Sequence, residues 1–299
     1  MVKKIINKTN SHDVCFDEKM REDKCITIKA KTCLGKVEVR YLMSKENLEK
    51  IRKVDMKQGL IGKVFDFTLK GLYGVRLNSY YGDAKVVVIP DGVEVIGGQC
   101  FVDNQTIEKV VIPDSVRRIG SRCFCACKNL KEVEISETNN IEFIGQRCFS
   151  SCKSLKSFRV PKGVDTIRQH CFLHCEALES VDLGNVSEVR LEAFSWCINL
   201  KNIIWSNEIT EIGYKGFEYC KSLETLRLPE KLERIGNESF EFCNKLKEVY
   251  IPKSVKFMGS SAFGFCNVLE NVYIENHNVE MDKYCFEGCK QANITYGSR

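Results

Sequence analysis

The chain has 299 residues, of which 43% are hydrophobic and 28% are charged, and its formal net charge is +5. These values are typical of a globular protein, and no apolar run is long enough to cross a bilayer, so the sequence excludes a helical membrane protein. The N-terminal segment MVKKIINKTNSHDVCF has no apolar stretch of signal-peptide length, which predicts a cytoplasmic protein.

The first 70 residues differ from the rest of the chain. Residues 25–28 and 37–41 alternate apolar and polar side chains around Gly35, which predicts a β-hairpin. Ser44 is placed to cap a helix that extends to Lys57. We expect residues 1–70 to form a small α+β segment that caps the following domain, because the first unit of a repeat array must be covered.

Positive charge is concentrated in this N-terminal segment. Residues 1–70 contain 17 Lys and Arg against 10 Asp and Glu, whereas the remainder contains 28 against 30. The lysines are scattered and have no interleaved aromatic residues, which is more typical of a solvated surface than of a nucleic-acid site. We therefore do not expect nucleic acid to be the partner.

A phenylalanine recurs every 22 to 25 residues through the rest of the chain, and this period indicates a solenoid of about nine repeats over residues 71–299. Three residues after the phenylalanine stands a cysteine in eight repeats, with Asn104 as the exception, and six residues after it stands Ile or Leu in the first eight repeats. The repeat phenylalanines are Phe101, Phe124, Phe149, Phe172, Phe194, Phe217, Phe240, Phe263 and Phe286.

The remaining repeat positions predict one short strand and one turn. Apolar residues nine and eleven positions after the phenylalanine, such as Val110 and Ile112, have the period of a strand with one buried face. All five prolines follow this strand and are expected to end it. A second apolar pair then leads back to the next phenylalanine through a turn that we expect to be helical or 3₁₀.

A unit such as SLETLRLPEKLERIGNESFEFC, residues 222–243, resembles the BspA-like, Treponema pallidum-type leucine-rich repeat. The resemblance implies an α/β repeat: a strand-rich, right-handed horseshoe or arc. It also implies recognition of macromolecules more than chemistry. Some relatives resemble surface adhesins, so export by a route that the sequence does not show is an alternative to a cytoplasmic location.

The 17 cysteines are interpreted mainly as structural thiols, because 13 of them occupy two recurrent repeat positions. The segment His170-Cys171-Phe172-Leu173-His174-Cys175 contains zinc-binding residue types, but both cysteines are already explained by the repeat. The sequence also lacks a phosphate-binding glycine loop, an HExxH motif and a GxSxG motif. We predict no enzyme activity, no metal and no cofactor.

Function is then expected where exposed positions depart from the repeat. Two residues after the phenylalanine, five consecutive repeats have rings, and aromatic residues dominate interface hot spots. Packing of these rings on one another to cover the turns is the alternative. The rings are His174, Trp196, Tyr219, Phe242 and Phe265.

A second candidate surface is the outward residue of each main strand, expected to line a concave sheet. Its variability fits a recognition face, although drift on a solvated face would look the same. The candidates there are Arg159, Asp182, Ile204, Arg227, Tyr250 and Tyr273.

Two further patterns bear on structure and assembly. Seven residues after the phenylalanine, opposite charges face each other in six of seven neighbouring pairs, which predicts a charge ladder that fixes register. The C-terminal repeat ends irregularly, so self-association through its edge or through the aromatic row is a hypothesis. The sequence favours a non-enzymatic protein-binding module or scaffold with a protein partner.

Overall fold

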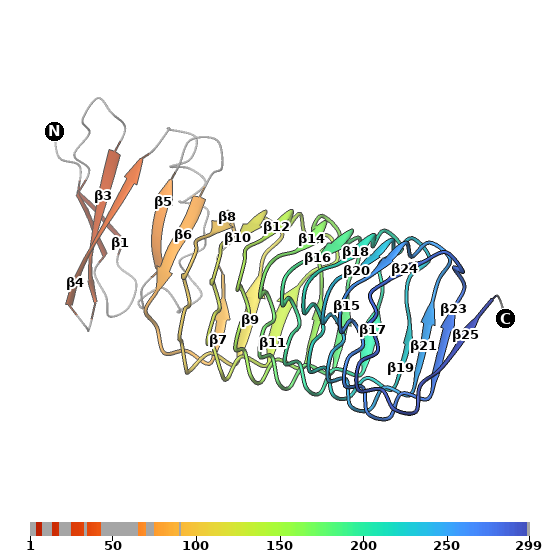
Figure 1. Ribbon diagram of the computed structural model, residues 1–299. Helices are drawn as coiled ribbons and strands as arrows, with labels where there is room; N and C mark the ends of the chain where they lie inside the picture. Colours follow the sequence, from red (N-terminus) through yellow and green to blue (C-terminus); the bar gives the residue numbers. More distant parts are fainter. Residues whose placement is uncertain are drawn as a thin grey trace.

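The computed structural model describes the backbone of residues 4–7, 14–17, 25–32, 35–42, 65–69 and 75–297 apart from residue 90, and side chains from residue 76 onward. Figure 1 shows the chain winding into a stack of parallel coils after the N-terminal strands. Each coil has a main strand, a short strand and a turn containing the repeat phenylalanine. The predicted strand-rich solenoid is therefore confirmed.

The main strands stack in parallel on one wall of the solenoid, which we call the main-strand wall. In β9, Val110 and Ile112 are buried while Lys109 and Val111 face outward, as the two-residue period predicts. The main strands are β7 (Val86–Val88), β9 (Lys109–Ile112), β11 (Glu132–Ile135), β13 (Ser157–Arg159), β15 (Ser180–Asp182), β17 (Asn202–Ile204), β19 (Thr225–Arg227), β21 (Glu248–Ile251), β23 (Asn271–Ile274) and β25 (Asn293–Tyr296).

The second apolar pair of each repeat forms a short strand, and these strands build a second wall, the short-strand wall. The sequence pattern had not predicted strands here, because two residues are too few to show a period. The short strands are β8 (Val93–Ile96), β10 (Arg118–Ile119), β12 (Phe143–Ile144), β14 (Thr166–Ile167), β16 (Glu188–Val189), β18 (Glu211–Ile212), β20 (Arg234–Ile235), β22 (Phe257–Met258) and β24 (Glu280–Met281).

The repeat phenylalanines form a continuous stack through the core. Eight of the nine are at most 1% exposed, and only Phe286 in the last coil is partly exposed. Neighbouring ring centroids lie 4.9–5.4 Å apart, with interplanar angles of 12° or less. Stacking of this kind adds about 0.5–1.5 kcal/mol per pair to the burial of each ring.

The cysteine three residues after each phenylalanine has a specific structural role. Its thiol donates a hydrogen bond to the carbonyl oxygen of the phenylalanine in the preceding coil, with Sγ–O distances of 3.0–3.5 Å in all eight repeats. Asn104, the exception, donates from Nδ2 to the carbonyl oxygen of Gly82 at 3.2 Å. Every repeat therefore has a hydrogen-bond donor at this position, and the free, mostly buried thiols confirm the structural interpretation of these cysteines.

The segment around each phenylalanine, from two residues before it to two after it, forms a third wall that we call the turn wall. Here the prediction of a helical or 3₁₀ turn is wrong. The residue two before the phenylalanine has a left-handed backbone in eight repeats, with φ of 49–60° and Tyr284 as the exception, and the residue two after it has φ of 54–63° in the non-glycine cases. A helix instead needs consecutive negative φ values. No helix occurs among the described residues, so the α component of the predicted α/β repeat is corrected.

Backbone hydrogen bonds between coils replace the bonds that a helix would make. The N–H of Phe217, for example, donates to the carbonyl oxygen of Ser239 in the next coil at 2.7 Å, and Tyr219 donates to Glu241 at 2.8 Å. The same bonds continue from Phe101 to Phe263. The turn wall is therefore a continuous ladder, although both strand walls divide into separate sheets.

One interruption of each strand wall lies beside the longest repeat, between Phe124 and Phe149. The main-strand wall is interrupted between β11 and β13 and again between β17 and β19, and the short-strand wall is interrupted between β12 and β14. Two extra residues in the loop after β11 account for the length, and Thr138 anchors this loop by donating to Asp114 at 2.8 Å. The short strands of the two coils that the insertion separates, β10 and β12, remain paired.

The structure tests two smaller predictions: that prolines end the main strands, and that opposite charges on neighbouring coils form a ladder. Prolines 113, 161, 229 and 252 follow main strands as expected, whereas Pro90 lies outside the described residues. The charge ladder is only partly present: Glu108–Lys131 at 2.7 Å and Glu179–Lys201 at 3.5 Å are ion pairs, and the other four expected pairs have none among the described residues. Long exposed side chains gain too little from pairing to fix the contact.

At the N-terminus, β1 (Lys4–Asn7), β2 (Val14–Asp17), β3 (Cys25–Thr32) and β4 (Gly35–Leu42) form an antiparallel sheet. The β3–β4 pair confirms the predicted hairpin, while the predicted helix from Ser44 to Lys57 lies outside the described residues. Strand β5 (Phe65–Leu69) pairs antiparallel with β6 (Val75–Tyr80), and β6 pairs in parallel with β8. The β5–β6 hairpin thus extends the short-strand wall beyond the first coil.

Candidate interaction surfaces

The structure brings the five predicted rings of the turn wall together in one row. Trp196 stacks on Tyr219 with ring centroids 4.1 Å apart, and the next two spacings are 4.6 and 5.0 Å. His174 lies 5.5 Å from Trp196 in a tilted arrangement. All five rings are partly exposed, so the row is a surface feature and not part of the core. We call these residues, His174, Trp196, Tyr219, Phe242 and Phe265, the aromatic row.

The backbone under the aromatic row is unusual for bulky side chains. Every member has a left-handed conformation, which costs about 1–2 kcal/mol for a residue other than glycine. The equivalent positions of earlier coils hold Asp103, Ala126 and Ser151 in the same conformation, so the turn itself does not require a ring. Mutual stacking offsets part of this cost, and the Lys221 ammonium lies 5.3 Å from the Tyr219 ring and 5.7 Å from the Trp196 ring.

The outward residues of the main strands also lie in register, but in two separate groups. Arg159 pairs with Asp182, with Nε and Oδ2 3.2 Å apart, and Asp182 lies beside Ile204, which is 61% exposed. In the next sheet the Arg227 guanidinium lies 3.9 Å from the Tyr250 ring centroid, and Tyr250 stacks on Tyr273 at 4.8 Å. We call these six residues the strand row.

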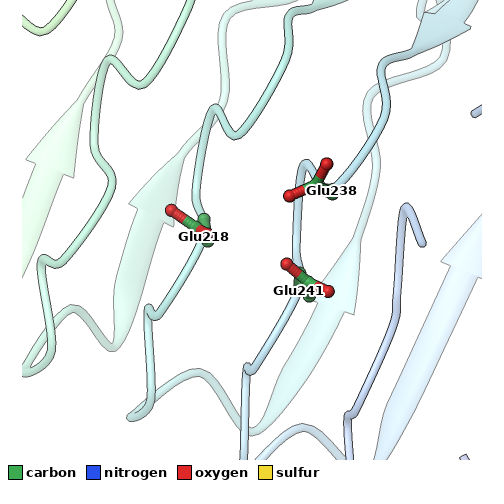
Figure 2. Close-up of side chains that lie close together, drawn as sticks. All are labelled: Glu218, Glu238 and Glu241. Carbon is green, nitrogen blue, oxygen red and sulfur yellow. The ribbon is translucent and has the colours of Figure 1, made fainter. Parts of the chain in front are cut away.

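A buried charged cluster lies in the turn wall beside the aromatic row, and sequence reasoning missed it. The Lys215 ammonium lies 2.8 Å from a carboxylate oxygen of Glu218 and 3.1 Å from one of Glu238. Ser195 donates to the other oxygen of Glu218 at 2.8 Å. Figure 2 shows Glu241 on the same coil as Glu238, with Glu218 on the neighbouring coil. Glu218 and Glu241 are only 5% and 8% exposed.

Burial and two neighbouring glutamates act together on Glu241. Desolvation, followed by the charges of Glu238 and Glu218, raises the pKa of the Glu241 carboxyl to about 7. The carboxylate oxygens of the three glutamates lie within 4.8 Å of one another, which resembles a cation site. The Lys215 ammonium already provides the positive charge that the cluster needs, so we assign no metal ion to it.

The His170–Cys175 segment does not build a comparable group. Cys171 and Cys175 point into the core, and burial raises the pKa of the Cys171 thiol to about 12. His170 Nε2 lies 3.6 Å from Glu192, and His174 belongs to the aromatic row. Among the described residues, the three glutamates are the only group of three or more His, Cys, Asp or Glu with ligand atoms this close. A thiol held protonated in the core is a packing group.

The coils stack in parallel, and residues at one repeat position form a row along the surface. This arrangement defines a parallel-solenoid repeat protein. Residues 78–190 and 178–293 match the family model described as the BspA type leucine rich repeat region (6 copies). The chain therefore belongs to the BspA-type leucine-rich-repeat family, as the resemblance predicted.

Two solved structures are similar to this chain to different degrees. A leucine-rich repeat protein from Bacteroides ovatus is 23% identical, with 79% of this chain and 70% of that chain covered and a TM-score of 0.66. The T. pallidum leucine rich repeat protein is also 23% identical, with 77% and 88% covered and a TM-score of 0.39. The first similarity shows the same fold. A comparison with curated proteins finds no match.

Within the described part of the chain, no helix has the length and apolarity needed to span a bilayer.

Proposed function

We propose that the protein is a non-enzymatic binding module or scaffold that engages another protein through the aromatic row, together with the strand row. The observation that carries the proposal is the aromatic row itself. Five partly exposed rings occupy positions where the backbone disfavours bulky side chains and where earlier coils have Ala or Ser. Rings retained at such a cost are well suited to burial against a partner, because aromatic anchors dominate binding energy at protein interfaces.

The strand row supports the same function from the adjacent wall. Ile204 is a large apolar side chain exposed to solvent, and Tyr250 and Tyr273 form a stacked pair beside Arg227. Tyr and Arg are enriched at interface hot spots. We place the aromatic row first because its rings are continuous over five coils, whereas the strand row is interrupted between two sheets.

The test is a quantitative pull-down from the native cell with three forms of the full chain. The first is the wild type, and the second replaces Trp196, Tyr219 and Phe242 by Ser. Serine suits the backbone because Ser151 has the same conformation at the equivalent position. The third is the control Tyr284→Ser, which removes an exposed ring, 48% exposed, outside the row.

We expect proteins captured by the wild type to be retained by the control and lost from the triple variant, while all three circular dichroism spectra agree. Equal capture by the triple variant would contradict the role of the row. A loss of folded signal in the triple variant would instead assign the rings to coil packing.

The N-terminal cap, self-association and the cellular location are further predictions, and the last two have direct measurements. Residues 1–70 as a cap are supported by the β5–β6 hairpin, which extends the short-strand wall past the first coil. Self-association through β25 or the aromatic row predicts a mass in light scattering that rises with concentration. Cell fractionation separates the predicted cytoplasmic location from the adhesin alternative, which requires the cell surface.

A further inference from the structure

Arginines without ion pairs gather on three consecutive coils. Ten arginines have described side chains, and four of them, Arg117, Arg159, Arg190 and Arg234, pair with carboxylates. Six have no ion pair among the described residues, and apart from Arg76 and Arg227 they lie on the coils of Phe124, Phe149 and Phe172. The four on these coils are Arg118, Arg122, Arg147 and Arg168, and we call them the arginine cluster.

Phe143 organises two members of the arginine cluster. The guanidinium carbon of Arg118 lies 4.2 Å from the Phe143 ring centroid, and that of Arg168 lies 4.4 Å from it. Arg118 is the register partner of Phe143 in the preceding coil, whereas Arg168 comes from the following coil. The ring therefore lies between two guanidinium groups and restricts both, while their N–H groups have no carboxylate partner.

The other two members lie in the adjacent turn wall. Arg122 and Arg147 occupy the same repeat position, two residues before the phenylalanine, on neighbouring coils. The Arg147 charge adds to burial in lowering the pKa of His170, so its positive potential extends to the third coil. The four guanidinium groups thus place positive charge on two walls of the same three coils.

The same repeat positions are acidic or paired further along the solenoid. Position 118 corresponds to Glu188 and Glu211, and position 122 corresponds to Glu192 and Glu238. Arg234 is the informative comparison, because it stacks on Phe257 at 4.1 Å just as Arg118 stacks on Phe143, yet it also pairs with Glu211 at 3.5 Å. An arginine–phenylalanine stack in this fold is therefore compatible with a neutralising carboxylate, which the arginine cluster lacks.

We propose that the arginine cluster, with Phe143 as its platform, is a binding site for a ligand with several phosphate groups. Guanidinium presents paired N–H donors that match two oxygens of a phosphate. Four such groups on three coils, spaced by about 5 Å from coil to coil, fit several phosphates better than one. The ligand is a free oligophosphate or a chain of phosphate esters, and the two share this chemistry. The site does not depend on the aromatic or strand rows.

Isothermal titration of the full chain with inorganic tripolyphosphate tests the proposal. We expect saturable binding that weakens as salt is added. The double variant Arg118→Gln, Arg168→Gln should weaken binding by about 10-fold or more, because it removes two charge-assisted donors. The matched control Arg234→Gln removes an equivalent stacked arginine outside the cluster and should change affinity by less than about 2-fold.

Two further arms define the chemistry. Arg118→Lys keeps the charge but loses the paired N–H donors. We expect its affinity for tripolyphosphate to lie between those of the wild type and the double variant while the protein remains folded. Displacement of tripolyphosphate by a single-stranded oligonucleotide at equal phosphate concentration would assign the site to a phosphodiester chain, and failure to displace would assign it to free oligophosphate. The proposal is overturned by absence of saturable binding, by an equal loss in Arg234→Gln, or by equally effective displacement with hexaglutamate.

Discussion

The thiol of Cys175 donates a hydrogen bond to the carbonyl oxygen of Phe149 in the preceding coil, with Sγ and O 3.1 Å apart. Both residues are fully buried, so removal of the donor leaves a carbonyl oxygen without this partner. We expect Cys175→Ala to lower the free energy of unfolding by about 1–3 kcal/mol. Cys175→Ser keeps a donor and should cost less than Cys175→Ala, as urea unfolding would measure. An equal or greater loss for Ser would mean that volume, and not the hydrogen bond, selects cysteine here.

The phenylalanine stack predicts a position-dependent cost of truncation. Phe217 is fully buried and stacked on both sides, so Phe217→Ala should destabilise the protein by about 3–5 kcal/mol. Phe286 is partly exposed and has one stacked neighbour, so Phe286→Ala should cost about half of that or less. Thermal unfolding of both variants compares the two costs. Equal costs would contradict the view that stacking from both sides stabilises the interior coils.

The left-handed turn positions predict an inverted order of substitutions. Ala126 has φ of 62°, a conformation that glycine adopts freely and that β-branched residues avoid. Ala126→Gly should therefore be neutral to within about 0.5 kcal/mol, while Ala126→Val should cost about 1–2 kcal/mol. At the control position Ala177, which has no left-handed backbone, the glycine variant should destabilise by roughly 0.5–1 kcal/mol. Chemical denaturation measures all three, and a greater loss for Ala126→Gly than for Ala126→Val would refute this account.

The glutamate cluster predicts that stability falls as pH rises. The pKa of Glu241 is raised to about 7 in the folded protein from an ordinary value of 4.5, so the folded state holds a proton that the unfolded state has lost between these values. Stability should decrease from about pH 5 to pH 8 in the wild type. Glu241→Gln removes the titration and should be more stable than the wild type at pH 8, by on the order of 1–3 kcal/mol.

The control for this pH dependence is Glu287→Gln. Glu287 occupies the same repeat position as Glu241, one residue after the phenylalanine, but it is exposed. Urea unfolding of the control at pH 5 and pH 8 should show the same decrease in the free energy of unfolding with pH as the wild type. If the stability of Glu241→Gln fell with pH as steeply as that of the wild type, the pH dependence would have to come from another titratable group.

Features that repeat in phase could be predicted from the sequence. The period places Phe217 and Cys175 in the core and Trp196 beside Tyr219, because residues at one repeat position become neighbours in any solenoid. Main strands are predictable for the same reason, since the alternation of Val110 and Ile112 recurs in nearly every repeat. These predictions need only the repeat period and not the backbone conformation between repeat positions.

Features that join different repeat positions could not be predicted in this way. Lys215 and Glu238 both precede their phenylalanines by two residues, so the period alone makes them neighbours, but Glu218 follows its phenylalanine by one and only the turn geometry brings it to Lys215. The stack of Arg118, Phe143 and Arg168 likewise joins positions that are out of phase, because Arg168 lies two residues beyond the equivalent of Phe143. A composition signal for the turns was nonetheless present, since no β-branched residue or proline occurs at either left-handed position in nine repeats.

The left-handed turn positions also determine how such a protein can acquire new binding specificities. At these positions the repeats hold charged, aromatic, small and amide side chains, and all of them except Tyr284 have the same left-handed backbone. The scaffold thus offers two columns of sites where very different side chains occur on one backbone, and valine, isoleucine, threonine and proline are absent from both columns. Combinatorial libraries built on these columns, with those four residues omitted, should yield folded variants with altered recognition at high frequency.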